Sequence, residues 1–332
     1  MRSNSPESLV QPVIEDPMLA NFELGFRRVY YPLGFPLELQ TNSRDVIEAA
    51  SEGWGLFSQA FEIAPLRLSL GVREAQNSEP LPLKSTFIAR EHLLAIVADA
   101  ANFVMCDFDQ SFSFGWITSA VASDYATLRY RILIPPTMMM AEQLALAPLH
   151  GALIARNDCG VLLCGESFAG KSTLAYACAR SGWTYISDDG TFLVRNRSDR
   201  YAVGDPHSIR FREDARELFP ELADRLVVTR PNGKIGMELF TRELPIAIAP
   251  GARIEHVVFL DRYHHGSARL RSYPKDLMQT WCRQFANFGN EHVRADMICC
   301  QQQLLGASVW ELSYRNLDDA VRRLDQLVGF GG

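Results

Sequence analysis

Short apolar runs separated by turn residues dominate the first part of the chain. Between residues 22 and 135, β-branched and aromatic residues gather in short segments, and Asn, Asp, Gly and Ser lie between them. This pattern predicts strands joined by turns. The expected strands are Phe26–Tyr31, Leu66–Val72, His92–Val97, Phe103–Phe108, Phe114–Thr118 and Leu128–Ile134. One helix is expected at Ser43–Ala50, with Ser43 as its N-cap.

From residue 136 onward, apolar strand-like runs alternate with longer segments of helical periodicity. The expected strands are Ala152–Ala155, Val161–Cys164, Trp183–Ser187, Thr191–Arg195, Ile254–Leu260 and Val309–Ser313. The expected helices are Thr137–Leu146, Ser172–Arg180, Lys275–Phe288, Glu291–Leu305 and Leu317–Val328. Mixing of strands and helices in this way is typical of an α/β fold with a mixed sheet.

The change of pattern suggests two domains, which also suits the length of 332 residues. Residues 1–21 are polar and contain three prolines, so they are expected to be a flexible tail. Residues 22–135 are expected to be a β-rich N-terminal domain. Pro135-Pro136 is expected to break the chain, because neither proline extends a helix or strand interior. Residues 136–332 then form the second domain.

Composition narrows the classes of function. The formal net charge of −6 provides no basic field for nucleic acid. No apolar run approaches the roughly 20 residues that span a bilayer, and the N-terminus lacks the order of a signal peptide. The seven cysteines include no Cys-x-x-Cys pair for zinc or redox chemistry. The chain is therefore expected in the cytoplasm, without a nucleic-acid or membrane partner.

The loop that follows Val161–Cys164 carries the strongest chemical signal. It has the pattern Gly-x-x-x-x-Gly-Lys-[Ser/Thr], and the helix expected after it begins with Ser172 and Thr173. Glycines let the backbone amides turn toward a phosphate, the lysine reaches the β- and γ-phosphates, and the Ser hydroxyl can bind Mg²⁺. The pattern predicts a site for ATP with Mg²⁺. Its residues are Gly165, Glu166, Ser167, Phe168, Ala169, Gly170, Lys171, Ser172 and Thr173.

Asp188-Asp189 follow the expected strand Trp183–Ser187. In α/β sheets, ligands gather at the carboxyl ends of strands, where a carboxylate can bind Mg²⁺ or accept a proton. An Asp-Asp-Gly turn without function is the alternative. A phosphate loop nearby in the sequence favours the functional interpretation. Arg210 and Arg212 are further candidates for contacting phosphate, or else they lie on a solvated face.

These motifs stand in a recognisable order. His150-Gly151 precedes Gly165 by fifteen residues, and Asp188-Asp189 follow the loop. The segment 148–205 resembles the catalytic domain of HPr kinase/phosphorylase, a family related in fold to phosphoenolpyruvate carboxykinase. The family's Glu-Ile-Arg-Gly-Leu-Gly signature is absent, however, and residues 1–135 do not resemble its usual N-terminal domain. HPr itself is therefore not the expected substrate.

The resemblance implies roles for particular residues. Asp188 would be the base that takes the proton of the acceptor hydroxyl, and Lys171 would hold the phosphates. His150 would lie near the transferred phosphate, whereas a structural turn residue is the alternative for a lone histidine. Ser172 and Asp189 would bind Mg²⁺.

Two functions follow from these expectations. The first is a kinase that transfers the γ-phosphate of ATP to a hydroxyl of a peptide, a protein or a small molecule. The second is a nucleotide-binding regulator or scaffold without transferase activity. A carboxylate base near the phosphates distinguishes them, because a binder has no need of one. The identity of the acceptor and a homo-oligomeric state both stay open at this point.

Overall fold

The first half of the protein is built on a mixed sheet. The computed structural model describes residues 22–74, 84–229, 235–262 and 266–329. In the first half, seven strands pair in the order β1-β2-β3-β7-β6-β5-β4. They are β1 (Phe26–Tyr30), β2 (Leu37–Thr41), β3 (Leu66–Arg73), β4 (Thr86–Arg90), β5 (Leu93–Val97), β6 (Phe103–Asp107) and β7 (Phe112–Thr118). The neighbours β2, β3 and β7 run parallel, and the other pairs are antiparallel.

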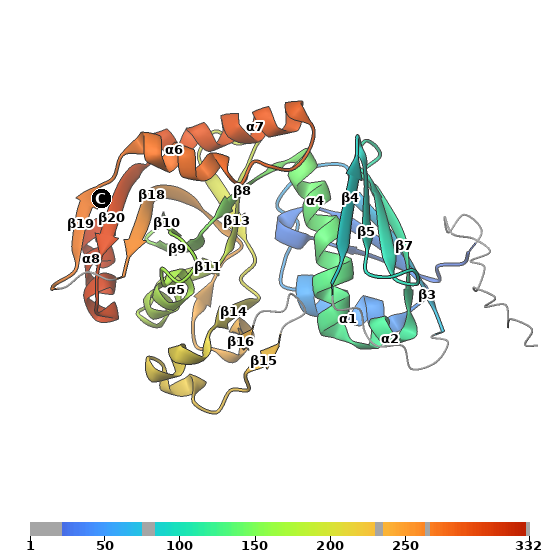
Figure 1. Cartoon of the computed structure of the whole chain (residues 1–332), viewed down its shortest axis with the longest axis horizontal. Coiled ribbons are helices and arrows are strands. Elements are labelled where there is room, and N and C mark those ends of the chain that lie inside the picture. Colours follow the sequence, from blue (N-terminus) through green and yellow to red (C-terminus); the bar gives the residue numbers. More distant parts are fainter. Residues whose placement is uncertain (1–21, 75–83, 230–234, 263–265, 330–332) are drawn as a thin grey trace, which may run out of the picture.

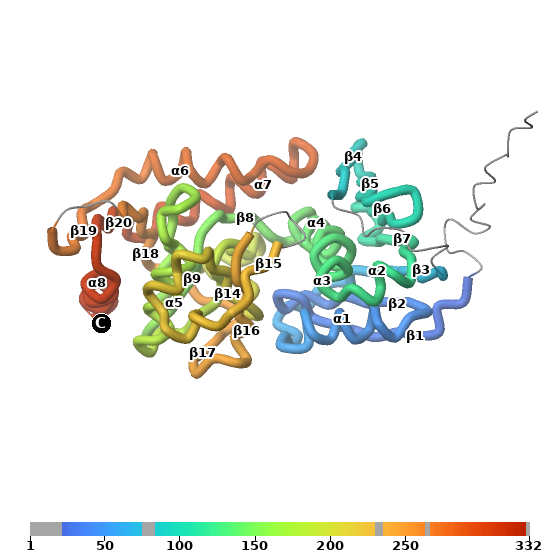
Figure 2. The backbone as a smooth tube through the Cα atoms, turned by 60° about the horizontal axis from the view of Figure 1, so that its bottom comes forward, coloured from blue at the N-terminus to red at the C-terminus, as the bar shows by residue number. Residues whose placement is uncertain are grey.

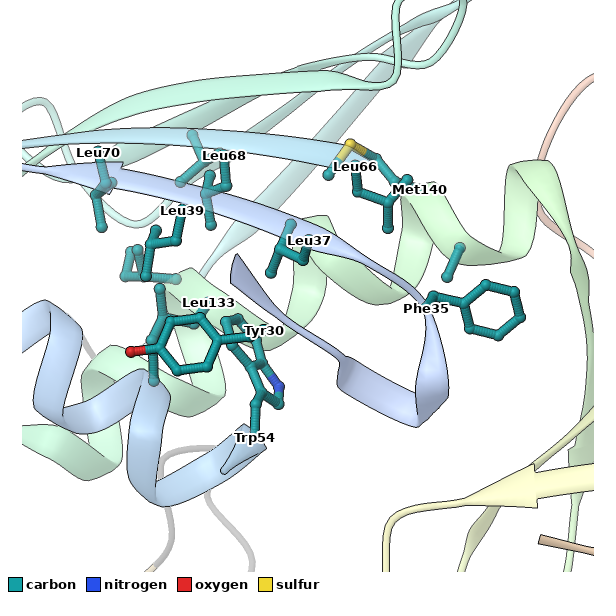
Figure 3. Packing of buried hydrophobic residues seen from close by; sticks show 14 of the residues in the cluster. Tyr30, Phe35, Leu37, Leu39, Trp54, Leu66, Leu68, Leu70, Leu133 and Met140 are labelled. Carbon is teal, nitrogen blue, oxygen red and sulfur yellow. The ribbon is translucent and has the colours of Figure 1, made fainter. Parts of the chain in front are cut away.

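Helices cover one face of this sheet. They are α1 (Arg44–Trp54), α2 (Ser119–Ser123), α3 (Tyr125–Thr127), the π-helical turn η2 (Leu128–Leu133) and α4 (Ile134–Leu144). Leucines of β2 and β3 face Tyr30, Trp54 and Leu133 in one buried cluster (Figure 3). The helix α1 connects β2 to the parallel strand β3, as a parallel pair requires a crossover.

Two expectations for this half are wrong. Leu128–Ile134 is helical rather than a strand, because Leu128, Ile132 and Leu133 bury one helical face against the sheet. Pro135-Pro136 does not break the chain, because both prolines lie in the first turn of α4. The helical backbone continues from η2 through Leu133 and Ile134 into α4, so the prolines interrupt neither segment.

The second half contains a larger mixed sheet. Its main path among the described residues runs β17-β11-β9-β10-β18-β13-β12-β8, and β20 extends it beside β18. The strands are β8 (Leu146–His150), β9 (Ala152–Arg156), β10 (Cys159–Cys164), β11 (Thr184–Ser187), β12 (Gly190–Val194), β13 (Tyr201–Gly204), β17 (Ala247–Ile248), β18 (Gly251–Asp261), β19 (Arg269–Ser272) and β20 (Ser308–Ser313). β10, β18 and β20 are parallel neighbours, so their carboxyl ends meet at one edge.

Helices lie on both faces of this sheet (Figures 1 and 2). One face packs against α5 (Lys171–Arg180) and α8 (Leu317–Gly329), and the other against α6 (Lys275–Arg283) and α7 (Glu291–Gln302). A small sheet lies beside α5 and completes the first of these layers. It consists of β14 (Ser208–Phe211), β15 (Val228–Thr229) and β16 (Ile235–Phe240), with the 3₁₀ turns η3 (Glu213–Glu217) and η4 (Pro220–Leu222) between β14 and β15.

The expected α/β class with mixed sheets is confirmed. Most expected elements of the second half are present within a few residues of their predicted bounds. The strands that were not expected are β8, β13, β15, β16, β17 and β19. The expected division at residues 135 and 136 falls inside α4, whose Met140 and Ala141 belong to the core of the first half. Val194 and Val203 of the second half join the same core. The division into domains stays a prediction, and the tail at 1–21 lies outside the described residues.

Within the described ranges, the structure contains no helix that is both long enough and apolar enough to cross a membrane. The seven cysteines are all free thiols.

The unexpected helical segment is a core element, which a pair of substitutions can test. Leu133→Ala removes a side chain with 0% exposure, so we expect the free energy of unfolding to fall by about 2–5 kcal/mol. Leu144→Ala serves as control, because Leu144 lies at the end of α4 with 43% exposure and should cost less than about 1 kcal/mol. Denaturant unfolding measures both. Equal losses would contradict this packing.

Candidate functional site

The loop between β10 and α5 depends on two glycines. Gly165 has φ +148° and Gly170 has φ +92°. A Cβ atom at Gly165 would lie 2.8 Å from Cβ of Ala169, and one at Gly170 would lie 2.9 Å from the Tyr314 hydroxyl. A side chain fits at neither position, so the backbone of the loop requires glycine at both glycine positions of the sequence pattern. Phe168 also has a positive φ of 77°, although its side chain is 64% exposed.

The loop delivers the chain into the N-terminus of α5. Gly170 occupies the N-cap position and offers no side chain to the first amide groups of the helix. Those amides have no acceptor within a helix, and they carry the positive end of its dipole. A helix N-terminus of this kind attracts a phosphate.

Lys171 is folded back across the loop. Its side chain is buried, and Nζ donates to the carbonyl oxygen atoms of Gly165 at 2.8 Å and Glu166 at 3.3 Å. Burial lowers the pKa of Lys171, and the charge of Asp189 opposes that shift. An anion that reached the loop would offer Nζ a better acceptor than these neutral carbonyl groups.

His150 connects the lysine to the second aspartate. It ends the edge strand β8, where pairing with β12 sets it opposite Gly190. Its Nδ1 lies 3.1 Å from Oδ1 of Asp189, and its Nε2 lies 3.3 Å from Nζ of Lys171. With the proton on Nδ1, the imidazole donates to Asp189 and accepts from Lys171. The edge position also explains how β8 tolerates Pro148, which cannot donate to a neighbouring strand.

Asp188 is buried just beyond the end of β11, with 7% exposure. Burial raises its pKa to about 6, and the positive charge of Arg210 opposes the rise. Its Oδ2 accepts a hydrogen bond of 2.9 Å from the backbone N–H of Arg210. At neutral pH the carboxylate is therefore ionised but close to the range in which it takes up a proton.

A cavity of about 250 Å³ opens where these elements meet. Most of the expected site residues line it, namely His150, Ser167, Phe168, Gly170, Lys171, Ser172, Thr173, Asp188 and Asp189. Gly165, Glu166 and Ala169 of the loop are not among its lining residues. They shape the turn behind it instead, since Gly165 and Glu166 accept from Lys171.

Arg210 and Arg212 also line the cavity, where Arg210 is half-buried and Arg212 is exposed, so the choice between a phosphate contact and a solvated face stays a prediction. The guanidinium of Arg212 lies 3.3 Å from the ring centroid of Phe168. Arg262, which the sequence did not single out, is a further lining residue. It follows the end of β18, and the rule that ligands gather at strand ends could have indicated it.

Arg210 is held by residues that no sequence pattern indicated. Its Nε lies 3.4 Å from Oε1 of Glu238, its partner across the β14–β16 ladder. Tyr130 of η2 donates its hydroxyl to the same carboxylate, and the Arg210 guanidinium lies 5.3 Å from the Tyr130 ring. Burial alone would raise the pKa of Glu238, but hydrogen bonds from Tyr130 and Ser208 outweigh it and lower the pKa. Tyr130 of the first half thus contacts Arg210, which lines the cavity.

No group of three or more His, Cys, Asp or Glu side chains that could hold a metal ion occurs in the ranges that the structure describes. Mg²⁺ does not need such a group, since it is commonly bound by one or two protein oxygen atoms together with substrate phosphates. Ser172 and Asp189 line one cavity and offer a hydroxyl and a carboxylate. This donor set fits Mg²⁺ that arrives with a nucleotide.

Comparisons with known proteins add little to what the geometry of the site shows. No protein-family model matches the chain, and no curated protein matches it. Among solved structures, the chain is similar to the Hpr(Ser) kinase/phosphatase from Coxiella burnetii, with 14% sequence identity and a TM-score of 0.30. The match covers 55% of this chain and 93% of the other. Any function therefore has to rest on the residues of the site.

The raised pKa of Asp188 has a consequence for stability. A buried carboxyl whose pKa is raised to about 6 in the folded state makes the protein less stable as pH rises from about 4 to 6. Asp188→Asn lacks this ionisation. We expect the variant to be more stable than the wild type at pH 8, by on the order of 2 kcal/mol, and the difference to vanish near pH 4. Unfolding curves at the two pH values measure this.

Asp107→Asn in the first sheet is the control for that comparison, because Asp107 does not line the cavity. A pH-independent difference between wild type and Asp188→Asn would contradict the burial of an ionised carboxylate.

Proposed function

We propose that the protein is an ATP-dependent phosphotransferase that moves the γ-phosphate to a hydroxyl group. The acceptor is a serine of a peptide or protein, or a hydroxyl of a small molecule. The observation that supports this most is that a buried lysine and a buried carboxylate line the same cavity at the N-terminus of α5. Sites of phosphoryl transfer commonly combine an anion cradle with a residue that orients or deprotonates the acceptor.

The loop residues and Lys171 bind and orient the phosphates. Backbone amides at the start of α5 point at the anion, and Lys171 exchanges the carbonyl groups of Gly165 and Glu166 for phosphate oxygen atoms. Catalysis of this kind is mostly positioning and neutralisation of charge. His150 contacts both Lys171 and Asp189 and so holds the two side chains in position relative to each other.

Asp188 acts on the acceptor. Its carboxylate takes the proton of the hydroxyl as the oxygen attacks the γ-phosphorus and the bond to the ADP oxygen breaks. The hydrogen bond from the Arg210 backbone holds one carboxylate oxygen, Oδ2, in place. A pKa of about 6 suits a base that works near neutral pH. Ser172 and Asp189 would hold Mg²⁺, which when bound neutralises phosphate charge.

Lys171→Ala tests the phosphate cradle. The substitution removes the charge-assisted contact to the β- and γ-phosphates, so we expect the affinity for Mg-ATP to fall by at least about tenfold, or about 1.4 kcal/mol. Isothermal titration calorimetry measures it. Lys84→Ala, at an exposed lysine outside the cavity, should bind as the wild type does. Unchanged affinity in Lys171→Ala would sink the assignment.

Asp188→Asn tests the base. Asparagine keeps the shape and one acceptor oxygen, so Mg-ATP should still bind. The rate of phosphoryl transfer, followed with γ-labelled ATP and mass spectrometry of candidate acceptors, should fall by about 10²–10⁴-fold. The wild-type rate should fall as the pH drops through about 6, because the carboxylate then takes up a proton.

Equal activity of Asp188→Asn and wild type would refute the base while leaving the phosphate loop intact. Binding of ATP without transfer or hydrolysis by the wild type would instead favour the nucleotide-binding regulator.

A further inference from the structure

We call the cavity at the N-terminus of α5 the phosphate cavity. A second cavity adjoins it at Arg262. It has a volume of about 480 Å³, and Arg262 lines both hollows. The carboxyl ends of β18 and β20 lie next to each other here, since the Tyr314 N–H bonds the Asp261 carbonyl at 2.9 Å. Because β10, β18 and β20 are parallel neighbours, the phosphate loop, Arg262 and Arg315 all lie at one edge of the sheet. That edge is where α/β sheets bind ligands.

One face of α5 runs through both cavities. Thr173 lines the phosphate cavity, whereas Ala177 and Arg180 line the second one. These three residues are spaced i, i+4 and i+7, so they share a helical face over a length of about 10 Å. Ala177 is half-buried and small, which leaves the middle of this face open.

The walls on either side are also continuous. On one side, Asp214 of η3 borders the phosphate cavity, and Glu217 at the end of η3 and the following Leu218 border the second. On the other side stand Arg315 and Asn316, between β20 and α8. The two hollows therefore form one groove that leads from the phosphate loop along α5.

The second cavity has the chemistry of a nucleoside site. Arg180 lies 5.5 Å from the Phe219 ring. Arg315 is exposed, and Leu218 on the opposite wall is 39% exposed. Guanidinium planes and apolar side chains stack on nucleobases. Glu217 and Asp318 offer carboxylates to ribose hydroxyl or base amino groups.

We propose that the nucleoside of the bound nucleotide lies in this groove, with its base between Ala177 and the Arg315-Asn316 segment. The proposal rests on the phosphotransferase function for the position of the phosphates. It adds a binding site for the base and ribose in residues that the phosphate motif does not contain. The enzyme then distinguishes a nucleoside triphosphate from a bare polyphosphate chain.

Two ligands separate the two parts of the site. Mg-ATP fills both cavities, whereas Mg-tripolyphosphate fills only the phosphate cavity. We expect the wild type to bind Mg-ATP at least about tenfold more tightly than Mg-tripolyphosphate, which corresponds to about 1.4 kcal/mol of binding free energy. Ala177→Leu fills the groove, so the affinity for ATP should fall by about tenfold, and that for tripolyphosphate should stay within about twofold. Ala295→Leu, at an exposed position of α7, is the matched control.

Arg315→Ala provides a second variant at an exposed residue, in case Ala177→Leu disturbs the packing of α5. This substitution should lower the affinity for ATP and leave the affinity for tripolyphosphate unchanged. Equal affinities of the wild type for the two ligands, unchanged by both substitutions, would overturn the nucleoside site and leave the phosphate loop standing. Loss of both ligands in Arg315→Ala would assign Arg315 to the phosphates and also overturn it. Failure of the wild type to bind either ligand would overturn the phosphotransferase itself.

Discussion

Parallel pairing of β10 with β18 is the constraint on which the rest of the site depends. The register runs from Gly160 opposite Ile254 to Cys164 opposite Phe259. It is buried on both faces, between α5 and α8 on one side and α6 and α7 on the other. Because parallel strands end at the same edge, this pairing determines that the loop after β10 and Arg262 after β18 lie at one edge of the sheet. A slip by one residue would turn the buried side chains of β10 to the opposite face.

A second constraint is the burial of charge beside that edge. Lys171, Asp188 and Glu238 all lose water on folding, and each is compensated by a particular neighbour. Lys171 bonds loop carbonyl groups, Asp188 bonds the Arg210 amide, and Glu238 receives the Tyr130 hydroxyl. Removing one partner from such a network leaves a buried charge unpaired, which costs more than the pair contributes.

The contact from Tyr130 to Glu238 has a consequence for the role of the first half. Tyr130 belongs to η2, and Arg129 beside it pairs with Glu52 of α1 at 3.1 Å. Arg210 therefore rests against the first half through the Tyr130 ring and the shared Glu238 carboxylate. A change in the packing of η2 would reach the residue whose backbone holds Asp188. The first half is in this sense part of the environment of the site.

The sequence by itself determined the glycine loop before α5, because Gly165 and Gly170 serve a local backbone geometry that a short pattern records. It also indicated Asp188-Asp189 and His150 through their order along the chain, and a strand at Phe26–Tyr31 through its aromatic and β-branched residues, which the structure has at Phe26–Tyr30. Only the tertiary structure decided that Leu128–Leu133 is helical, since the burial of this segment against the first sheet overrides local preference. Tyr130, Glu238 and the groove along α5 depend on contacts between distant segments, and no local pattern encodes those contacts.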